Sequence, residues 1–320
     1  MNHVVYQDSS ENKAMFWKNK RLGSVFYKAK EKSFPYLLLI PALVVLFSII
    51  IYPIIYVICL SFFRWNWAIP TIGIQWVGLG NFKKLMGNRL FWNSLKNTVY
   101  YMGVDVGLQL CIGLGLALLL DKPFRGRTVI RTIFMIPFFI IPVVAAILWR
   151  MMYHPRMGIL NYLLSDVLRV IPKDFKWLAD PSQAINLIIF ADIWRITPFV
   201  FLVMVAGLQT IPQQLCEAAE IDGANKVQVF LYVTLPWLKP IILFVLFIRL
   251  TDVVMVFDLP YILTGGGPSA ATEVLGLTVY NQAFSLFEFG YASSTAVVIL
   301  LLSLGLIVSL HSTLSTEKVT

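Results

Sequence analysis

Six long apolar runs dominate this sequence and restrict its possible folds more than any other feature. Each approaches the length of about 20 residues that a helix needs to cross a bilayer. Backbone polar groups inside lipid must be satisfied within the segment, which helices achieve. The predicted fold class is therefore all-α: a polytopic membrane protein with six transmembrane helices. The predicted spans are 36–63, 98–120, 132–149, 184–208, 237–259 and 292–314.

Composition agrees with this interpretation. The chain has 320 residues, of which 58% are hydrophobic and 13% charged, whereas a soluble domain is typically about 25% charged. The sequence predicts three parts: a basic N-terminal tail, a six-helix membrane domain and a short C-terminal tail. Their predicted ranges are 1–35, 36–314 and 315–320.

Basic residues are unevenly distributed along the chain. Seven of the 26 Lys and Arg residues lie within residues 1–33, four lie in the loop 121–131, and the loop 260–291 has none. Basic residues beside a span usually mark its cytoplasmic side. The pattern predicts that both termini are cytoplasmic. It also explains the net charge of +9 without nucleic acid, which we exclude as a partner.

The sequence lacks the residue patterns that several other features require. The first apolar run is long and no small-residue cleavage site follows it, so it is predicted to remain as a span rather than be removed as a signal peptide. The three cysteines are odd in number and have no CxxC spacing, and the three histidines are scattered, so neither disulfides nor a metal site is expected. The phosphate-binding pattern GxxxxGK[ST] is absent, so ATP is not bound by that route.

One polar segment interrupts the apolar pattern between the fourth and fifth spans. Residues 212–226 combine a starting proline, helix-forming Glu and Ala residues, and Gly223 as a stop or bend. Two interpretations stay open on residue types alone. The segment could lie on lipid headgroups, or it could dock in a groove of a partner protein. Its acids favour the protein, because anionic headgroups would repel them.

The spacing within this segment resembles a known motif. Glu217-Ala218-Ala219, three residues, Gly223, nine residues, and Val233-x-Leu235-Pro236 resemble the EAA motif of permease subunits of binding-protein-dependent ABC importers. The extended form continues through Asp222 to Ala224. The resemblance implies the type I ABC importer permease fold, and it makes 212–226 a coupling helix held by a cytoplasmic ATPase.

Further motifs resemble the carbohydrate-type branch of that family, which is related to the first maltose permease. The resemblance covers about residues 36–312, although the large insertion and extra spans of the maltose subunit are missing. The motifs are Val77-Gly78-Leu79-Gly80-Asn81-Phe82, Asn97-Thr98, Trp194-Arg195-x-x-Pro198-Phe199, Gly207-Leu208-Gln209-x-Ile211-Pro212, Phe257-Asp258-x-Pro260-Tyr261, Thr264-Gly265-Gly266-Gly267-Pro268, Ala283-Phe284 and Gly290-Tyr291-Ala292.

The resemblance implies a multi-subunit importer in a bacterial cytoplasmic (inner) membrane. Its expected partners are a second permease subunit in a heterodimer, two cytoplasmic ATPases, an extracytoplasmic solute-binding protein and a sugar. The chain itself would be no enzyme and would hold no cofactor, since ATP and Mg²⁺ would bind the ATPases. Leu235 and Pro236 complete the expected coupling set with Glu217, Ala218, Ala219, Asp222 and Gly223.

Ionisable residues inside spans are functional candidates by default. They are Asp105, Asp192, Arg195, Arg249 and Asp252. The last four form two pairs with i,i+3 spacing, so each pair lies on one helix face. They could line a polar cavity for sugar hydroxyls, or they could neutralise one another to hold the helices together. The resemblance adds Phe199 to the substrate-facing candidates.

Two further alternatives concern substrate and outer partner. A phosphorylated polyol such as glycerol-3-phosphate could meet Arg195 and Arg249, although the neighbouring acids favour a neutral sugar. At the outer end of the fifth span, Asp258 and Gly265-Gly266-Gly267 could contact the binding protein. They could equally form a structural turn, because glycines before a proline do so readily.

Two other function classes compete with the importer. A secondary transporter could use titration of Asp105 or Asp192, and it would need no ATP. A membrane enzyme is disfavoured, because the sequence has no nucleophile–base pair and no metal-ligand constellation.

Overall fold

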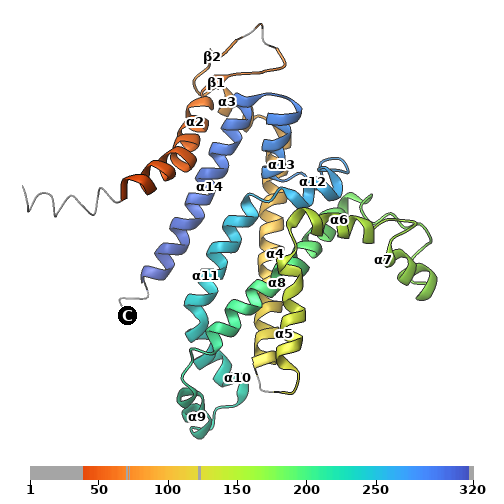
Figure 1. The fold of residues 1–320 in the computed structure, drawn as a ribbon, viewed down its shortest axis with the longest axis vertical. Helices are drawn as coiled ribbons and strands as arrows, with labels where there is room; N and C mark the ends of the chain where they lie inside the picture. Colours follow the sequence, from red (N-terminus) through yellow and green to blue (C-terminus); the bar gives the residue numbers. More distant parts are fainter. Residues whose placement is uncertain (1–38, 70, 72, 122–123, 317–320) are drawn as a thin grey trace, which may run out of the picture. The chain divides into compact units, whose positions relative to one another are not determined.

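A computed structural model describes residues 39–69, 71, 73–121 and 124–316 (Figure 1). The predicted N-terminal tail 1–35 and the last residues 317–320 lie outside the described part. The chain divides into two units after Val57. The described part of the first unit is helical and apolar, and its side chains are largely exposed. It contains η1 (Phe47–Ile51) and begins α2 (Tyr52–Leu60).

The second unit is built almost entirely from helices. A small antiparallel ribbon, β1 (Phe63–Arg64) and β2 (Gln75–Trp76), pairs Phe63 with Trp76. The helices that follow, in chain order, are α3 (Gly80–Met86), α4 (Arg89–Asp121), α5 (Arg127–Met135), η3 (Ile136–Phe139), α6 (Pro142–Met152), α7 (Ile159–Asn161), η4 (Tyr162–Val167), α8 (Pro181–Leu208), α9 (Gln213–Ile221), α10 (Lys226–Val229), η5 (Phe230–Thr234), α11 (Leu235–Val254), α12 (Asp258–Thr264), α13 (Leu275–Tyr280), η6 (Asn281–Ser285) and α14 (Phe289–Thr316).

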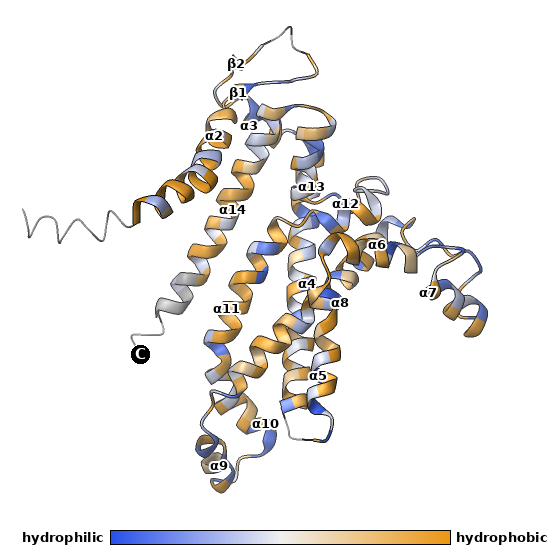
Figure 2. Ribbon diagram, in the orientation of Figure 1, coloured by the Kyte–Doolittle hydropathy of each residue, from blue (hydrophilic) through white to orange (hydrophobic). Residues whose placement is uncertain are grey.

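The structure confirms the all-α membrane class. Within the described residues, five helices are long and apolar enough to cross a membrane, and a bent pair makes a sixth candidate. Figure 2 shows that apolar residues predominate along these helices. The five are 39–60, 89–121, 181–208, 226–254 and 289–310.

The third span was predicted as one helix over 132–149, and that prediction is wrong. The chain instead forms Arg127–Phe139 and Pro142–Met152, which meet at 97°. Two prolines explain the break. Pro142 disfavours the α conformation at the preceding residue, and Ile141 is accordingly extended, with φ −57° and ψ 137°. Pro137 starts the tighter turn η3, whose last residue passes into an extended Ile140.

Other predicted boundaries also shift. Helix α4 begins at Arg89 rather than Thr98, so its 33 residues extend about 50 Å. The fifth span runs from Lys226 to Val254, not from 237 to 259. Pro236 lies inside this continuous helical segment, as the second residue of α11 and two residues after the π-helical turn η5. Such a widened turn fits a position where proline removes a backbone N–H.

The core lies between α4 and α8, which pack together more extensively than any other pair of elements. Gly113 allows the close approach. A Cβ atom at this position would lie 2.7 Å from Val200 Cγ1 and 3.2 Å from the Phe201 backbone nitrogen. Small residues at helix crossings in membranes allow such backbone contact. The α4–α8 pair thereby forms a fixed support for the polar side chains described below.

Polar side chains at the start of α4 hold the segment between α12 and α14. Asn97 Nδ2 donates to the carbonyls of Ala270 and Glu273, at 3.2 and 2.9 Å. The Thr98 hydroxyl accepts the Leu275 backbone N–H at 2.9 Å. The predicted Asn97-Thr98 motif is therefore an anchor for this segment, which the structure describes as α13, η6 and the turns before them.

Glu273 lies inside that anchored segment and is 6% exposed. Its Oε1 accepts hydrogen bonds from Thr278 Oγ1 at 3.2 Å and Asn281 Nδ2 at 3.1 Å. Burial raises the pKa of this carboxyl, and the two hydrogen bonds oppose that rise only in part. Gly266 packs on the same carboxylate, because a Cβ there would clash with Glu273 Oε2.

The packing at Gly113 generates the first prediction. Gly113→Ala should destabilise the protein by about 1–3 kcal/mol, because an added methyl group overpacks the α4–α8 contact. Gly115→Ala is the matched control, since a Cβ there meets nothing within 4 Å. Thermal unfolding in detergent measures both. Equal melting temperatures for the two variants would contradict the packing argument.

The burial of Glu273 generates a pH prediction. Its folded pKa is raised above the unfolded value, so its contribution to stability is present at low pH and is lost as pH rises through the folded pKa. Glu273→Gln stays neutral and keeps an acceptor oxygen. The melting temperature of this variant relative to that of the wild type should therefore increase as the pH rises above about 4, the ordinary pKa range of a glutamate. Glu288→Gln, on a more exposed carboxylate, should show no comparable gain. A pH-independent difference at position 273 would refute the explanation.

Candidate functional site

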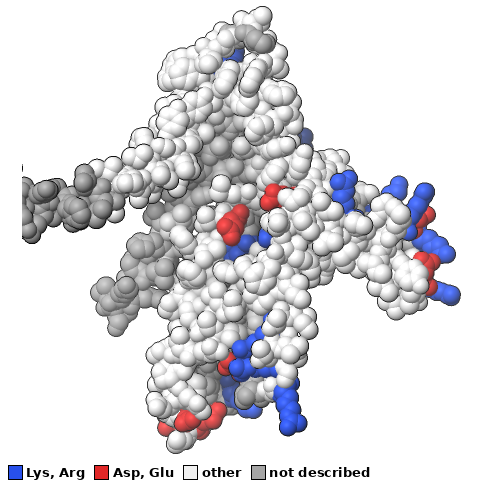
Figure 3. All heavy atoms as spheres, in the orientation of Figure 1, with Lys and Arg blue, Asp and Glu red and all other residues white. Residues whose placement is uncertain are grey.

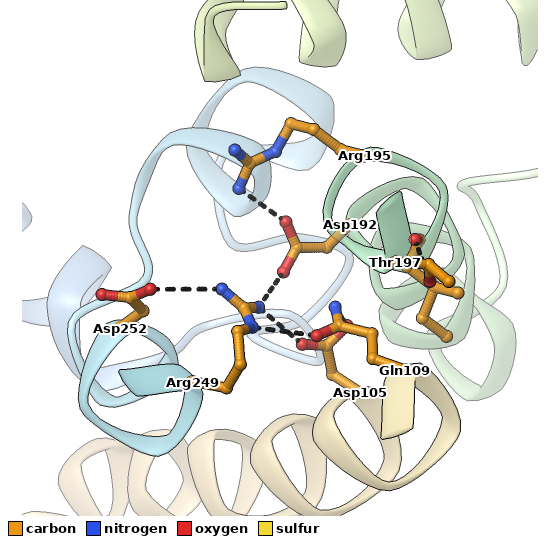
Figure 4. Close-up of polar contacts among 8 residues, drawn as sticks. Asp105, Gln109, Asp192, Arg195, Thr197, Arg249 and Asp252 are labelled. Atoms are coloured by element: carbon orange, nitrogen blue, oxygen red, sulfur yellow. Dashed lines mark hydrogen bonds and ion pairs between the residues drawn. The ribbon is translucent and has the colours of Figure 1, made fainter. Parts of the chain in front are cut away.

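Six polar residues from three helices meet within the helical bundle (Figure 4). We call this group the charged hub. Helix α4 supplies two members, α8 two and α11 two, each pair separated by three or four residues, which places them on one helix face. The members are Asp105, Gln109, Asp192, Arg195, Arg249 and Asp252.

Arg249 is the centre of the hub. Its Nη2 donates to Asp105 Oδ2 and to Asp192 Oδ2, both at 3.0 Å. Its Nε donates to Gln109 Oε1 at 2.9 Å. Its Nη1 reaches Asp252 Oδ2 on its own helix at 3.4 Å. A rigid fork of five N–H donors suits arginine to such bridging, which lysine could not reproduce.

The remaining oxygens of the two bridged acids are also occupied. Asp105 Oδ1 accepts from Gln109 Nε2 at 2.8 Å, and Asp192 Oδ1 accepts from Arg195 Nη2 at 2.8 Å. Every carboxylate oxygen of both residues therefore has a partner. Burying a charge is costly unless it is paired and hydrogen-bonded, and the hub meets that condition for both acids.

Exposure divides the hub into an inner and an outer part. The side chains of Asp105, Asp192 and Arg249 are no more than 4% exposed. Arg195 is 15% exposed and Asp252 is 59% exposed. The four least exposed charges balance as two acids and two arginines. Asp252 adds an accessible carboxylate at the edge, whereas the Nε atom of Arg195 is buried and has no partner among the described residues.

The structure thus separates the predicted substrate-binding residues. It joins Asp192, Arg195, Arg249 and Asp252 in one network, and the bonds across helices are those of the bundle-holding interpretation. Phe199, one helical turn beyond Arg195, points elsewhere. Its ring stacks on Phe138 with centroids 5.5 Å apart.

Gln109 is the hub member that the sequence analysis missed. An uncharged amide in an apolar run attracts little attention by itself. Its signal is the i,i+4 spacing from Asp105, which aligns both side chains on the face of α4 that packs against α8 and α11. Asp105 was recognised as an intramembrane charge, but sequence could not identify its partner, 144 residues away.

The segment predicted as a coupling helix forms a helix–turn–helix unit. Helix α9 covers Gln213–Ile221 and is followed by Gly223, whose φ of +89° suits glycine. Asn225 then caps α10, because its Oδ1 accepts the N–H groups of Val227 and Gln228. The predicted turn at Gly223 between two short helices is confirmed. Leu235 and Pro236 lie beyond it, at the start of α11.

This unit exposes acids and three large apolar side chains, Leu215, Ile221 and Val227. Glu217, Ala218 and Asp222 are exposed, and Ala219 is half-buried. Ile221 is 85% exposed at the end of α9. Figure 3 shows acidic atoms gathered at the tip of the molecule formed by α9 in Figure 1. A carboxylate surface with an exposed isoleucine has the composition of a protein contact.

The predicted binding-protein contacts lie at the two ends of α12. Asp258 begins the helix, and Gly265 ends it with φ +61°. Gly265, Gly266 and Gly267 form one wall of a cavity of about 350 Å³. The other residues that line the cavity are Leu90, Ala270, Glu273, Thr278, Asn281, Gln282 and Leu286. Asp258 does not line it.

The described residues do not form a candidate metal site. Among them, no group of three or more His, Cys, Asp and Glu side chains is arranged to hold an ion. The hub's three acids surround an arginine instead. Cys59, Cys111 and Cys216 are free thiols.

Comparison with known proteins identifies the chain's relatives. Its residues 109–319 match the model of the family described as binding-protein-dependent transport system inner membrane component. The trehalose/maltose transport system permease protein MalF of Thermococcus litoralis is 38% identical over 87% of this chain and 92% of its own length. The trehalose transport system permease protein SugA of Mycobacterium tuberculosis is 33% identical over 87% of each chain.

Solved structures share the fold. A chain of a bacterial ABC transporter involved in import of the acidic polysaccharide alginate superposes with a TM-score of 0.76. It is 23% identical and covers 90% of this chain and 97% of its own. The predicted importer-permease fold is therefore confirmed, and the relatives are transport proteins rather than enzymes. The chain belongs to the binding-protein-dependent transport system inner membrane components, the membrane permease subunits of ABC importers.

Proposed function

We propose that this chain is one of two permease subunits of an ABC importer for a mono- or oligosaccharide. It would move its substrate by alternating access, driven by ATP hydrolysis on separate subunits. The names of two relatives, which specify trehalose and maltose, support the sugar class. The absence of a phosphate-binding pattern from the sequence supports an ATPase on another chain.

One observation carries the proposal: α9 and α10 connect the two helices that hold most of the hub. Helix α8, with Asp192 and Arg195, ends directly before α9. The helical segment that begins with α10 continues into α11, with Arg249 and Asp252. A force applied to the exposed unit at 212–226 therefore enters both helices at once. This link between a cytoplasmic handle and a polar centre is what an ATP-coupled permease requires.

The partners follow from that arrangement. Two cytoplasmic ATPases would hold ATP and Mg²⁺, and one of them would receive α9. Glu217 and Asp222 would meet basic residues of its cleft, and Ile221 would enter an apolar pocket. Ala218 and Ala219 would allow close approach. Gly223 would let the backbone turn, and Leu235-Pro236 would pass the movement into α11. A second, different permease subunit would complete the pathway.

The hub suggests how a sugar is contacted. Asp252 offers an accessible acceptor, and Arg195, whose side chain is 15% exposed, offers guanidinium donors; both suit hydroxyl groups. Asp192 and Arg249 would position these two residues rather than touch substrate, because their own hydrogen bonds are filled. The accessible charge is a carboxylate, which favours a neutral sugar over a phosphorylated polyol. Phe199 would face substrate only after leaving its stack with Phe138.

Orientation and outer docking complete the proposal. Both termini would be cytoplasmic in a bacterial inner membrane, in accord with the basic N-terminal tail. Asp258 and Gly265-Gly266-Gly267 would then lie outside and contact the solute-binding protein. The cavity beside the three glycines offers that protein a concave surface.

Charge reversal tests the coupling role. Glu217→Lys should reduce uptake by reconstituted importer to near background, because a cation would replace the carboxylate presented to the ATPase. Asp166→Lys is the control, with the same charge change on an exposed residue far from α9. Uptake of labelled sugar into proteoliposomes containing ATP is the measurement. Normal ATP-coupled uptake by Glu217→Lys would eliminate the coupling role.

Two asparagine variants separate contact from positioning. Asp252→Asn should raise the KM for uptake with an unchanged melting temperature, because the residue is exposed. Asp192→Asn should lower stability by about 3 kcal/mol, because it removes the buried charge that pairs with both Arg249 and Arg195. Transport kinetics and thermal unfolding measure the two effects. The assignment fails if Asp252→Asn leaves the KM unchanged or if Asp192→Asn melts like wild type.

A further inference from the structure

The segment between α6 and α8 has an inverted distribution of polar and apolar residues. We call residues 150–180 the lateral arm, which contains α7 and η4. On its helical part, Ile159, Tyr162, Leu163 and Val167 follow i,i+3,i+4,i+8 spacing, and each is at least 43% exposed. The opposite face carries Asn161 and Ser165, which are 3% and 8% exposed. A segment surrounded by water would place these residues the other way round.

Specific hydrogen bonds hold the polar face inward. The Asn161 side chain donates to the carbonyl oxygens of Pro155 and Phe175. Its Oδ1 accepts the Trp177 indole N–H at 2.5 Å. These contacts close the two ends of the arm on one another and fix the helix rotation. These hydrogen bonds therefore hold the apolar face outward, and the segment does not rotate freely.

The apolar surface extends beyond the helix. Met157 is 83% exposed, Val170 72% and Leu168 62%. On α6, Val144, Ile147, Leu148 and Met151 are also exposed and continue the surface toward the bundle. Contiguous apolar surface of this kind marks an interaction site.

The direction of the arm indicates its surroundings. Figure 1 shows α6 and α7 leading sideways, away from α4 and α8. Helix α6 lies at 97° to α5–η3. If α5–η3 follows the membrane normal, α6 and the arm that follows it lie close to the plane of the membrane.

Charge at the edge of the arm favours lipid as the occupant. The arm has five basic residues and three acidic ones. Figure 3 shows basic atoms projecting along its margin. Arg156–Asp174 and Lys173–Asp166 form exposed ion pairs. No ion pair to Arg169 or Lys176 occurs among the described residues, so the arm presents excess positive charge. An apolar face with a cationic rim is typical of segments that lie in a membrane interface.

We propose that the lateral arm is a membrane-interface anchor. Its face of Ile159, Tyr162, Leu163 and Val167 lies among acyl chains, and its basic rim binds phosphate groups of anionic phospholipids. The anchor fixes the outer end of the third span in the bilayer plane while the hub helices move. This role does not depend on which substrate the importer carries.

Spin labels in the assembled importer test the proposal. Tyr162→Cys and Val167→Cys are each labelled with a nitroxide in a chain whose Cys59, Cys111 and Cys216 are replaced by alanine. The complex is placed in nanodiscs of phosphatidylcholine and phosphatidylglycerol. Collision rates with oxygen and with a water-soluble nickel chelate are then measured. Both labels should show an oxygen-to-nickel ratio several-fold above that of a label at Asp174→Cys, the matched control on the rim.

Two outcomes would overturn the anchor. A nickel accessibility equal to that of the Asp174→Cys label would place the face in water. Low accessibility to both oxygen and the nickel chelate would mean that a protein partner covers the face.

A second measurement uses the unmodified chain and avoids any folding defect of the variants. Photoactivatable phosphatidylglycerol should leave adducts on residues 157–170, and their absence, with adducts present on the spans, would also reject the proposal.

Discussion

The helical bundle depends on the ion pairs and hydrogen bonds that the guanidinium group of Arg249 forms. One side chain, 3% exposed, satisfies buried acids from α4 and α8 and contacts a third acid on its own helix. Without it, Asp105 and Asp192 would face each other across an apolar interior with no counter-charge. Such a pair of buried carboxylates is expensive. The close approach of α4 and α8 at Gly113 is consistent with Arg249 as the centre of the hub. The rotation of α11 and the exposure of Asp252 are consistent with it too.

The same arrangement connects the hub to the exposed unit formed by α9 and α10. Helices α8 and α11 meet at Arg249 and are joined again, covalently, by α9 and α10. A relative movement of α9 must therefore either carry both helices as a unit or break hydrogen bonds at the hub. Because the hub bonds are short and largely excluded from water, unit movement costs less. The outer edge, with Asp252 and Arg195, would move with it.

Sequence patterns determined much of this architecture, and the failures have identifiable physical causes. Hydropathy identified the five long apolar helices and the apolar region of the bent pair, because lipid imposes a strict requirement on length and polarity. It missed the 97° break, since hydropathy does not register that Pro142 forces Ile141 out of the helix. The i,i+3 pairs revealed which hub residues share a face, but not the pairing of Arg249 with Asp105, which depends on how distant helices pack. The apolar face of the lateral arm was missed because its short helix is too brief for a periodic signal.

Helix α4 connects three features along its whole length. Over about 50 Å, this single helix anchors the segment between α12 and α14 through Asn97, carries Asp105 and Gln109 near its middle, and meets α8 at Gly113. A continuous helix resists bending, so displacement at one end is transmitted to the other as in a lever. Thermodynamic linkage then applies in both directions. If a ligand at one end of α4 strengthens a binding event at the other end by favouring one tilt of the helix, that event must tighten the binding of the ligand by the same factor.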